Sequence, residues 1–115
     1  MHVTDHTTVL DRRQLRDITL DDDELMREVL TALLDDTAKQ VALLDLAIRA
    51  RDPKKTMQLA HYCKGACANI GANAVAAVLR SLEQEAARHS FADCAVSLCN
   101  LTQELERLRV EAVEV

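Results

Sequence analysis

The sequence predicts an all-α protein: an antiparallel up-down-up-down four-helix bundle with a short additional N-terminal helix. Apolar residues make up 49% of the 115 residues, yet only one Tyr and one Phe are present, so the core has to be built from aliphatic side chains and Met. Four long segments repeat their apolar residues with the period of a helix, and none alternates as a strand does. The connections between them are short, which favours consecutive helices that run antiparallel.

The first ten residues are largely polar and show no periodicity. We therefore expect residues 1–10 to form a flexible N-terminal segment and residues 11–115 to form the bundle. Asp11 is placed to begin a short helix from Arg12 to Ile18. Its apolar residues, Leu15 and Ile18, are expected to pack over one end of the bundle.

The first long helix is predicted from about Asp22 to Ala50. Acidic residues just before its apolar run supply a cap and complement the helix dipole. The buried stripe of this helix is predicted to contain Leu25, Val29, Ala32, Leu33, Leu43, Leu44 and Ile48. Leu30 and Leu34 widen the stripe enough to indicate contacts on two sides of the helix.

The second long helix is predicted from Pro53 to Ile70. Asp52 is the expected N-cap, and proline is well suited to the first helical position because its missing N–H would have no partner there. Gly71 follows at the position of a C-terminal cap. The turn between the first two long helices is tight, so the second has to run back along the first.

Two further helices complete the bundle. Asn73 is the expected N-cap of the third, and the pair His89-Ser90 interrupts the pattern before the fourth helix starts at Phe91. The apolar stripe of the third helix is predicted to contain Val75, Val78, Leu79, Leu82 and Ala86. That of the fourth is predicted to contain Phe91, Ala95, Leu98, Thr102, Leu105 and Leu108.

One histidine lies on the wrong side of the second long helix for a core residue. At about 100° per residue, His61 is opposite the apolar side of this helix, which faces the core. Its neighbours on the solvent face, at i+3, i+4 and i+7, are Lys64, Gly65 and Ala68. A glycine inside a helix costs about 1 kcal/mol relative to alanine. Close approach by another molecule would explain Gly65.

The order His61, Lys64, Gly65, then Asn69-Ile70-Gly71-Ala72, resembles the signature of the histidine-containing phosphotransfer (HPt) domain family. The similarity extends through Leu82-Glu83 in the next helix. It departs from the family pattern in packing residues: Cys63 replaces a usual leucine, Ala66 and Cys67 replace small hydroxyl residues, and Leu34 replaces a frequent phenylalanine.

The resemblance implies a phosphocarrier without kinase activity of its own. His61 would accept a phosphoryl group from an aspartate of one receiver domain and pass it to an aspartate of another, in response regulators or a hybrid histidine kinase. Mg²⁺ would be bound by the receiver, so no cofactor is expected here. Lys64 and Glu83 would assist His61, and the expected docking surface is Met57, Gln58, Gly65 and Ala68.

These roles agree with the chemistry of the side chains. Imidazole is largely neutral near pH 7 and offers a nucleophilic lone pair without a separate base. Lys64 is a flexible point charge that can follow the phosphoryl oxygens. Glu83 could accept a hydrogen bond from Nδ1–H and leave Nε2 free, although Arg80 at i−3 offers it an ordinary surface ion pair.

The charge, the apolar segments and the cysteine spacing argue against several other classes of protein. The net charge of −5 argues against nucleic-acid binding, which requires clustered Lys and Arg. No signal peptide and no run of about 18 uncharged apolar residues is found, so we expect a cytoplasmic protein without membrane contact. The spacing of the four cysteines does not match a zinc site. A complete bundle needs no partner, so a monomer is expected.

Two rival functions come from other classes. A helical-bundle adaptor would bind partner proteins with His61 chemically idle. A metal-binding bundle is the other, but Glu85 and His89 supply only half a site, and no Glu-x-x-His pair is present.

Overall fold

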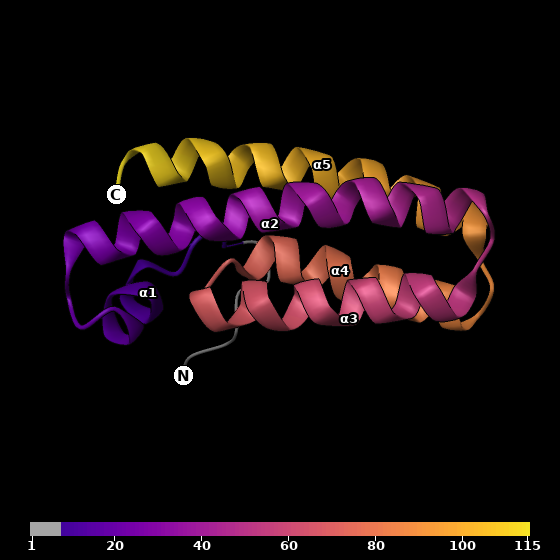
Figure 1. Cartoon of the computed structure of the whole chain (residues 1–115), viewed down its shortest axis with the longest axis horizontal. Helices are drawn as coiled ribbons and strands as arrows, with labels where there is room; N and C mark the ends of the chain where they lie inside the picture. The colour runs from indigo at the N-terminus through magenta and orange to yellow at the C-terminus, as the bar shows by residue number, and fades with distance from the viewer. Residues whose placement is uncertain (1–7) are drawn as a thin grey trace.

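The computed structural model describes residues 8–115, which form five helices. These are α1 (Arg12–Ile18), α2 (Asp23–Arg49), α3 (Pro53–Ile70), α4 (Asn73–Ala87) and α5 (Phe91–Val113). Helices α2 to α5 run alternately up and down, and each packs on two neighbours: α2 on α3 and α5, and α4 on α3 and α5 (Figure 1). The shorter α1 lies beside α2 and α3 at the end where α2 and α5 extend beyond the other two helices (Figure 1). The predicted fold is confirmed.

Aspartates cap three of the helices: Asp11 and Asp52 as predicted, and Asp22 from the acidic run that was predicted to cap the first long helix. The side chains of Asp11, Asp22 and Asp52 each accept a hydrogen bond from a backbone N–H in the first turn. At the end of α3, Gly71 has the left-handed conformation of a C-cap, with φ of 93°. A Cβ at Gly71 would also lie 2.8 Å from the Asp11 carbonyl oxygen. Gly71 therefore ends α3 and gives the N-terminal segment room to approach.

The predicted N-cap of α4 is wrong. The helix begins at Asn73 itself, the cap position is Ala72, and no side chain caps this end. Instead, the backbone N–H of Ala74 donates to the carbonyl oxygen of Thr8 at 2.9 Å. A segment distant in sequence thus provides the acceptor that the Asn73 side chain was expected to provide.

The described part of the expected flexible segment 1–10 packs on the bundle. Leu10 is buried, and the N–H of Asp11 donates to the Gly71 carbonyl oxygen at 2.8 Å. Residues 1–7 of the segment predicted to be flexible lie outside the described residues. Within the described range, the chain from Thr8 onward is tied to the α3–α4 turn.

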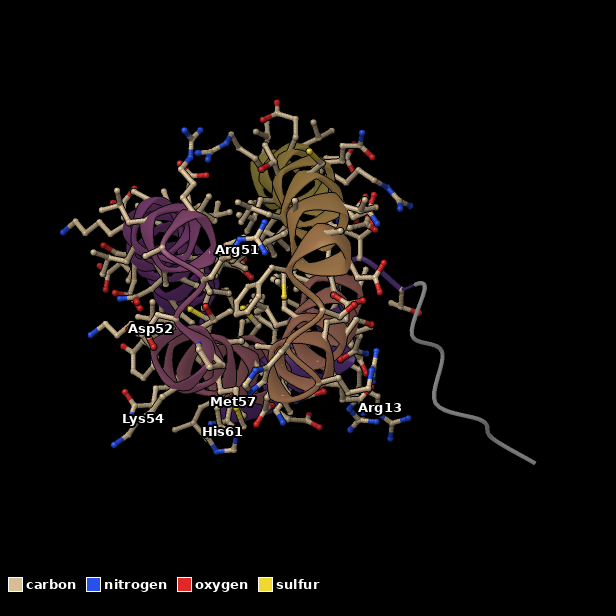
Figure 2. The ribbon with its side chains drawn as sticks, turned by 90° about the vertical axis from the view of Figure 1, so that its right-hand side faces the viewer. Arg13, Arg51, Asp52, Lys54, Met57 and His61 are labelled. Atoms are coloured by element: carbon tan, nitrogen blue, oxygen red, sulfur yellow. The ribbon has the colours of Figure 1, made fainter. Side chains whose placement is uncertain are left out.

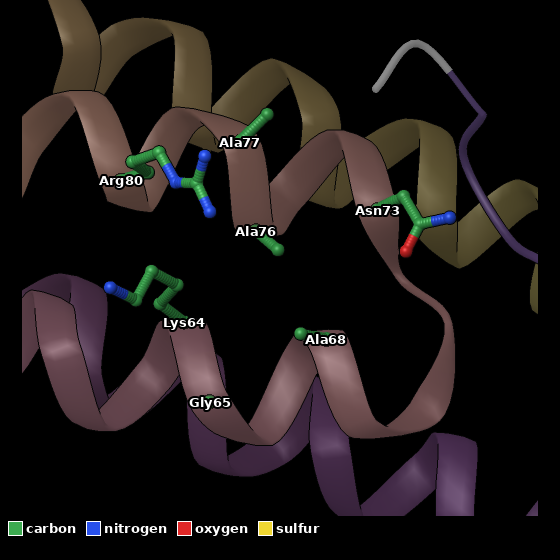
Figure 3. A pocket seen from close by; sticks show the side chains of 7 residues that line it. All are labelled: Lys64, Gly65, Ala68, Asn73, Ala76, Ala77 and Arg80. Carbon is green, nitrogen blue, oxygen red and sulfur yellow. The ribbon is translucent and has the colours of Figure 1, made fainter. Parts of the chain in front are cut away.

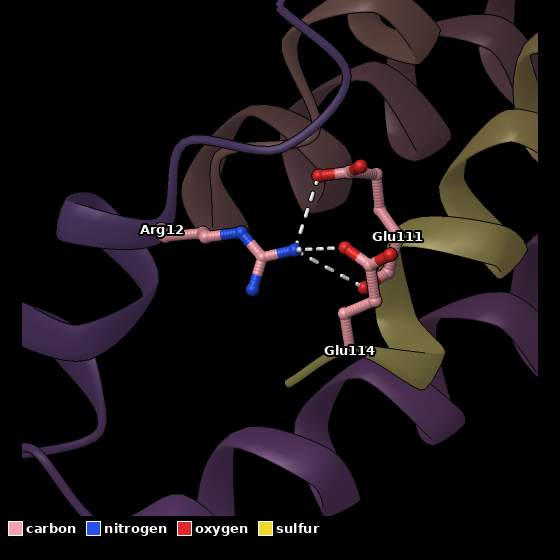
Figure 4. A network of polar contacts seen from close by, with 3 residues as sticks. All are labelled: Arg12, Glu111 and Glu114. Carbon is pink, nitrogen blue, oxygen red and sulfur yellow. Dashed lines mark hydrogen bonds and ion pairs between the residues drawn. The ribbon is translucent and has the colours of Figure 1, made fainter.

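Helix α1 is fixed from both sides. Leu15 is fully buried, whereas Ile18 is 50% exposed and does not pack over the bundle as expected. The Arg12 guanidinium lies 3.2 Å from a carboxylate oxygen of Glu111 and 3.5 Å from one of Glu114, which joins α1 to the end of α5 (Figure 4). The Gln14 amide donates to the Ala68 carbonyl oxygen at 2.6 Å and caps the last turn of α3.

The core is aliphatic, and Leu33, Leu44, Ile48, Leu105 and Leu108 are buried as predicted, but two of the predicted stripes also include exposed residues next to buried ones. In α2, Leu25, Ala32 and Leu43 are exposed, whereas their successors Met26, Leu33 and Leu44 are buried. In α5, Ala95 and Thr102 are exposed, whereas their predecessors Cys94 and Leu101 are buried. The reason is geometric: α2 contacts only α3 and α5 among the long helices, so one side of its wide apolar surface has no partner within the described chain.

Three of the four cysteines are packing residues. Cys63, Cys67 and Cys94 are buried and Cys99 is exposed. Burial raises the pKa of the Cys63 thiol to about 12 and that of Cys67 to about 11, so neither is a thiolate at neutral pH.

No group of three or more potential metal-ligating His, Cys, Asp or Glu side chains is found within residues 8–115. Over the same range, none of the helices has the length and apolar character needed to cross a bilayer.

Candidate functional site

His61 projects from the middle of α3 into solvent. Its side chain is 70% exposed, and it points away from the bundle in the end-on view of Figure 2. The core side of α3 is formed by Thr56, Ala60, Cys63 and Cys67, which are all buried. The helical pattern therefore holds the ring on the outer surface, as predicted.

Glu83 of α4 contacts this ring. Its Oε2 lies 3.1 Å from Nδ1 of His61, and its Oε1 accepts a hydrogen bond of 2.7 Å from Nζ of Lys64. The Glu83 side chain is only 24% exposed, because α4 packs closely along α3. We call these three residues the His61–Glu83–Lys64 cluster. The alternative pair between Glu83 and Arg80 is absent from the described residues.

The surroundings of Glu83 keep it ionised. Its partial burial alone would raise the pKa of the carboxyl group, but the hydrogen bond and charge of Lys64, and then those of His61, outweigh burial and lower the pKa. Glu83 is therefore a carboxylate at neutral pH and acts only as an acceptor. Nδ1 of a neutral His61 has to carry the proton in order to donate to it.

This tautomer leaves the Nε2 lone pair available. Within residues 8–115, Nε2 has no hydrogen-bond partner, and the ring is open to solvent on that side. The cluster thus combines an accessible nucleophilic nitrogen, an anion that fixes the ring, and a cation one helical turn away.

A groove of about 450 Å³ lies beside the cluster between α3 and α4 (Figure 3). Its α3 wall is formed by Lys64, Gly65 and Ala68, and its α4 wall by Asn73, Ala76, Ala77 and Arg80. A Cβ at Gly65 would meet no atom within 4 Å, so the fold does not require glycine there. Arg80 has no ion-pair partner among the described residues, and it places a positive charge at the edge of the groove (Figure 3).

The predicted docking residues lie on both sides of His61. Gly65 and Ala68 line the groove, whereas Met57 and Gln58 precede His61 by about one turn of α3 and do not line it. Gln58 is exposed and Met57 packs partly against the core. The residues of the α4 wall were not predicted from the sequence. The only available signal was the run of small residues before Arg80, which is equally typical of any tightly packed helix.

We expect Glu83→Ala to change the tautomer of His61. Without the carboxylate, Nδ1–H loses its acceptor, so the ring should populate both neutral tautomers. Nitrogen NMR of the imidazole measures this balance directly. An unchanged balance would show that Glu83 does not orient the ring, and Glu85→Ala is a control because Glu85 pairs with Ser97 instead.

We also expect Glu83 to make stability depend on pH. Because its folded pKa lies below its unfolded value, the carboxylate stabilises the fold above the unfolded value, and this contribution is lost as the pH falls through the folded value. Glu83→Gln should therefore lower the melting temperature at pH 7 and differ less from the parent in acid. An equal difference at both pH values would contradict this assignment.

Comparison with known proteins agrees with the geometry. The family model of the Hpt domain matches residues 28–111. The crystal structure of histidine-containing phosphotransfer protein B (HptB) from Pseudomonas aeruginosa PAO1 superimposes with a TM-score of 0.85 at 22% identity, over 94% of each chain. A search of curated proteins found no match. The matched region contains all three residues of the His61–Glu83–Lys64 cluster.

Proposed function

Because the chain belongs to the Hpt domain family, whose members are phosphocarriers of phosphorelays, we propose that it carries a phosphoryl group on Nε2 of His61 between aspartates of receiver domains. One observation supports this most strongly: the contact of 3.1 Å between His61 Nδ1 and Glu83, on a ring that is 70% exposed. The contact keeps the proton on Nδ1, so the lone pair of Nε2 is available for attack, and the exposure of the ring leaves Nε2 accessible.

The step follows from this arrangement. The Nε2 lone pair attacks phosphorus of the receiver's aspartyl phosphate, the N–P bond forms, and the P–O bond breaks with its electron pair leaving on the aspartate. The ring becomes a cation that keeps its Nδ1 proton, and the Glu83 carboxylate at 3.1 Å offsets that charge. The reverse step delivers the group to a second receiver. Mg²⁺ is expected on the receiver, and no kinase activity is proposed for this chain.

Lys64 is proposed to move between two anions. In the described state its Nζ is 2.7 Å from Glu83, and its four-carbon side chain lies on the same helical face as His61. A phosphoryl group on Nε2 would add a second, more highly charged acceptor nearby. Lys64 would then stabilise the phosphorylated form and the transition state.

Lys64→Ala should slow transfer roughly tenfold without abolishing it, since a charge-assisted hydrogen bond is worth about 1.5–3 kcal/mol and the receiver's metal shares the task. Rapid-quench kinetics with a phosphorylated receiver measures the rate. Lys55→Ala on the same helix, distant from the cluster, is the control. Equal rates for Lys64→Ala and the parent would make Lys64 a structural partner of Glu83 only.

The groove is proposed as part of the receiver's docking surface. Gly65 and Ala68 have no large side chain to project beside His61. Met57 and Gln58 extend the surface in the other direction along α3. A receiver on this surface would have its aspartate above the ring. A cytoplasmic location remains a prediction that follows from such partners.

The experiment that tests the function is transfer from a panel of phosphorylated receivers, followed by mapping of the labelled residue. We expect acid-labile label on His61. Binding of receivers without transfer from any of them would instead favour the adaptor function, in which His61 is chemically idle.

A further inference from the structure

Helix α2 carries a second apolar row on its outer surface. The row consists of the exposed Leu25, Ala32, Leu43, Leu46 and C-cap residue Ala50, together with Val29, which is half-buried and also packs against the core. Leu25, Leu43 and Leu46 are 37%, 43% and 64% exposed, so this row is distinct from the core row of Met26, Leu30, Leu33 and Leu44. The exposed part of this row has no helix packed over it within residues 8–115.

The spacing of the row is that of a coiled-coil seam. From Leu25 to Ala50 its positions alternate by four and three residues, which keeps them on one slowly turning stripe. Two positions in this series are not apolar: Asp36 and Lys39, at its centre. They have opposite charge, and Lys39 has no ion-pair partner among the described residues.

These two charges distinguish the possible orientations of two such rows. In a parallel pair, equal residue numbers meet, so Asp36 would oppose Asp36 and Lys39 would oppose Lys39. In an antiparallel pair about a two-fold axis, Asp36 of each copy meets Lys39 of the other. The same register opposes Val29 to Leu46 and Ala32 to Leu43, so every position in the row meets a compatible one.

We propose that the outer row of α2 binds the same row of a second copy of this chain, antiparallel and about a two-fold axis. This pairing would cover the exposed side chains of Leu25, Ala32, Leu43 and Leu46 in both copies. The Tyr62 hydroxyl donates to Oδ2 of Asp36 at 3.1 Å, which holds this carboxylate in place and leaves Oδ1 for the lysine of the second copy.

This interface adjoins α3, because Tyr62, the residue after His61, donates to Asp36 at the centre of the row. His61 projects from α3 on a side that α2 does not occupy, and the groove lies between α3 and α4 (Figure 2). Association is measured on this chain alone and phosphotransfer with a receiver, so failure of one proposal can be distinguished from failure of the other.

Sedimentation velocity over a range of concentrations tests the association. In place of the monomer expected from the sequence, we expect a reversible monomer–dimer equilibrium. Leu46→Glu should weaken it at least tenfold, because the charge is introduced twice in a symmetric interface. Val96→Glu is the matched control: Val96 is 60% exposed, but on α5. A parent that remains monomeric at concentrations up to about 1 mM would overturn the proposal. Equal loss with both variants would overturn it too.

Charge exchange tests the orientation. Lys39→Asp and Asp36→Lys should each weaken association at least fivefold, and the double variant should restore it, because only an antiparallel pair brings the two positions together. Tyr62→Phe controls for the lost hydrogen bond to Asp36. Failure of the double variant to recover would exclude this register.

A disulfide provides an independent measurement. In a Cys99→Ser background, which removes the exposed thiol, Val29→Cys with Leu46→Cys should form a covalent dimer on mild oxidation. Val29→Cys alone should not, because position 29 does not meet itself in the antiparallel register. Cross-linking of the single variant as fast as the double one would contradict the arrangement.

Discussion

His61→Gln is expected to abolish phosphorylation while leaving the fold intact. Glutamine has no nucleophilic ring nitrogen, and the side chain it replaces is 70% exposed and outside the core. The loss should therefore be complete within detection, because no other described residue combines an accessible imidazole with an orienting carboxylate and a neighbouring cation. Phosphate transfer from a labelled receiver and circular dichroism measure the two halves of this prediction.

His89→Gln is the matched control. His89 is also exposed, but its ring lies next to Phe91 in the α4–α5 turn and has neither a carboxylate nor a lysine partner among the described residues. The His89→Gln variant should therefore accept phosphate on His61 at the parent's rate. Acid-labile label that persists in His61→Gln, or that maps to His89, would contradict the assignment of the phosphoacceptor.

The ends of the helices could be predicted because local chemistry determines them. Asp11, Asp22 and Asp52 cap their own first turns, and Gly71 adopts the left-handed conformation that ends α3. The position of His61 also follows from one helical period. Asn73 could not be predicted correctly, because the acceptor near it is the carbonyl of Thr8, which only tertiary structure brings there.

The packing faces were less predictable for a related reason. Successive residues lie about 100° apart around the axis of a helix. When an apolar residue lies next to the buried row, the sequence pattern assigns it to the buried face as well, and the predicted face becomes too wide. In α2 this led to Leu25 and Leu43 being assigned to the core, although the neighbours of α2 cover only the side that carries Met26 and Leu44. The α4 wall of the groove was missed because small residues such as Ala76 and Ala77 do not distinguish an open groove from a close contact.

Gly65 provides the sharpest test of how the surface beside His61 is used. Since a Cβ at this position meets no atom within 4 Å, Gly65→Ala should gain about 1 kcal/mol of helix propensity, and Gly65→Gln should be nearly as stable. A receiver aspartate, however, has to come within reacting distance of Nε2. The larger side chain projects into that approach, and a displacement of about 1 Å can cost about a hundredfold in rate.

We therefore expect Gly65→Gln to reduce phosphotransfer about a hundredfold, Gly65→Ala to reduce it much less, and the melting temperature to hold or rise in both. Ala38→Gln, on the exposed surface of α2, is a matched control that should change neither quantity. The opposing effects on stability and rate are what separate a docking surface from an ordinary exposed helix. If Gly65→Gln is as stable as the parent and accepts phosphate at the parent's rate, the receiver does not approach His61 across Gly65, and docking has to be sought on the side of Met57 and Gln58.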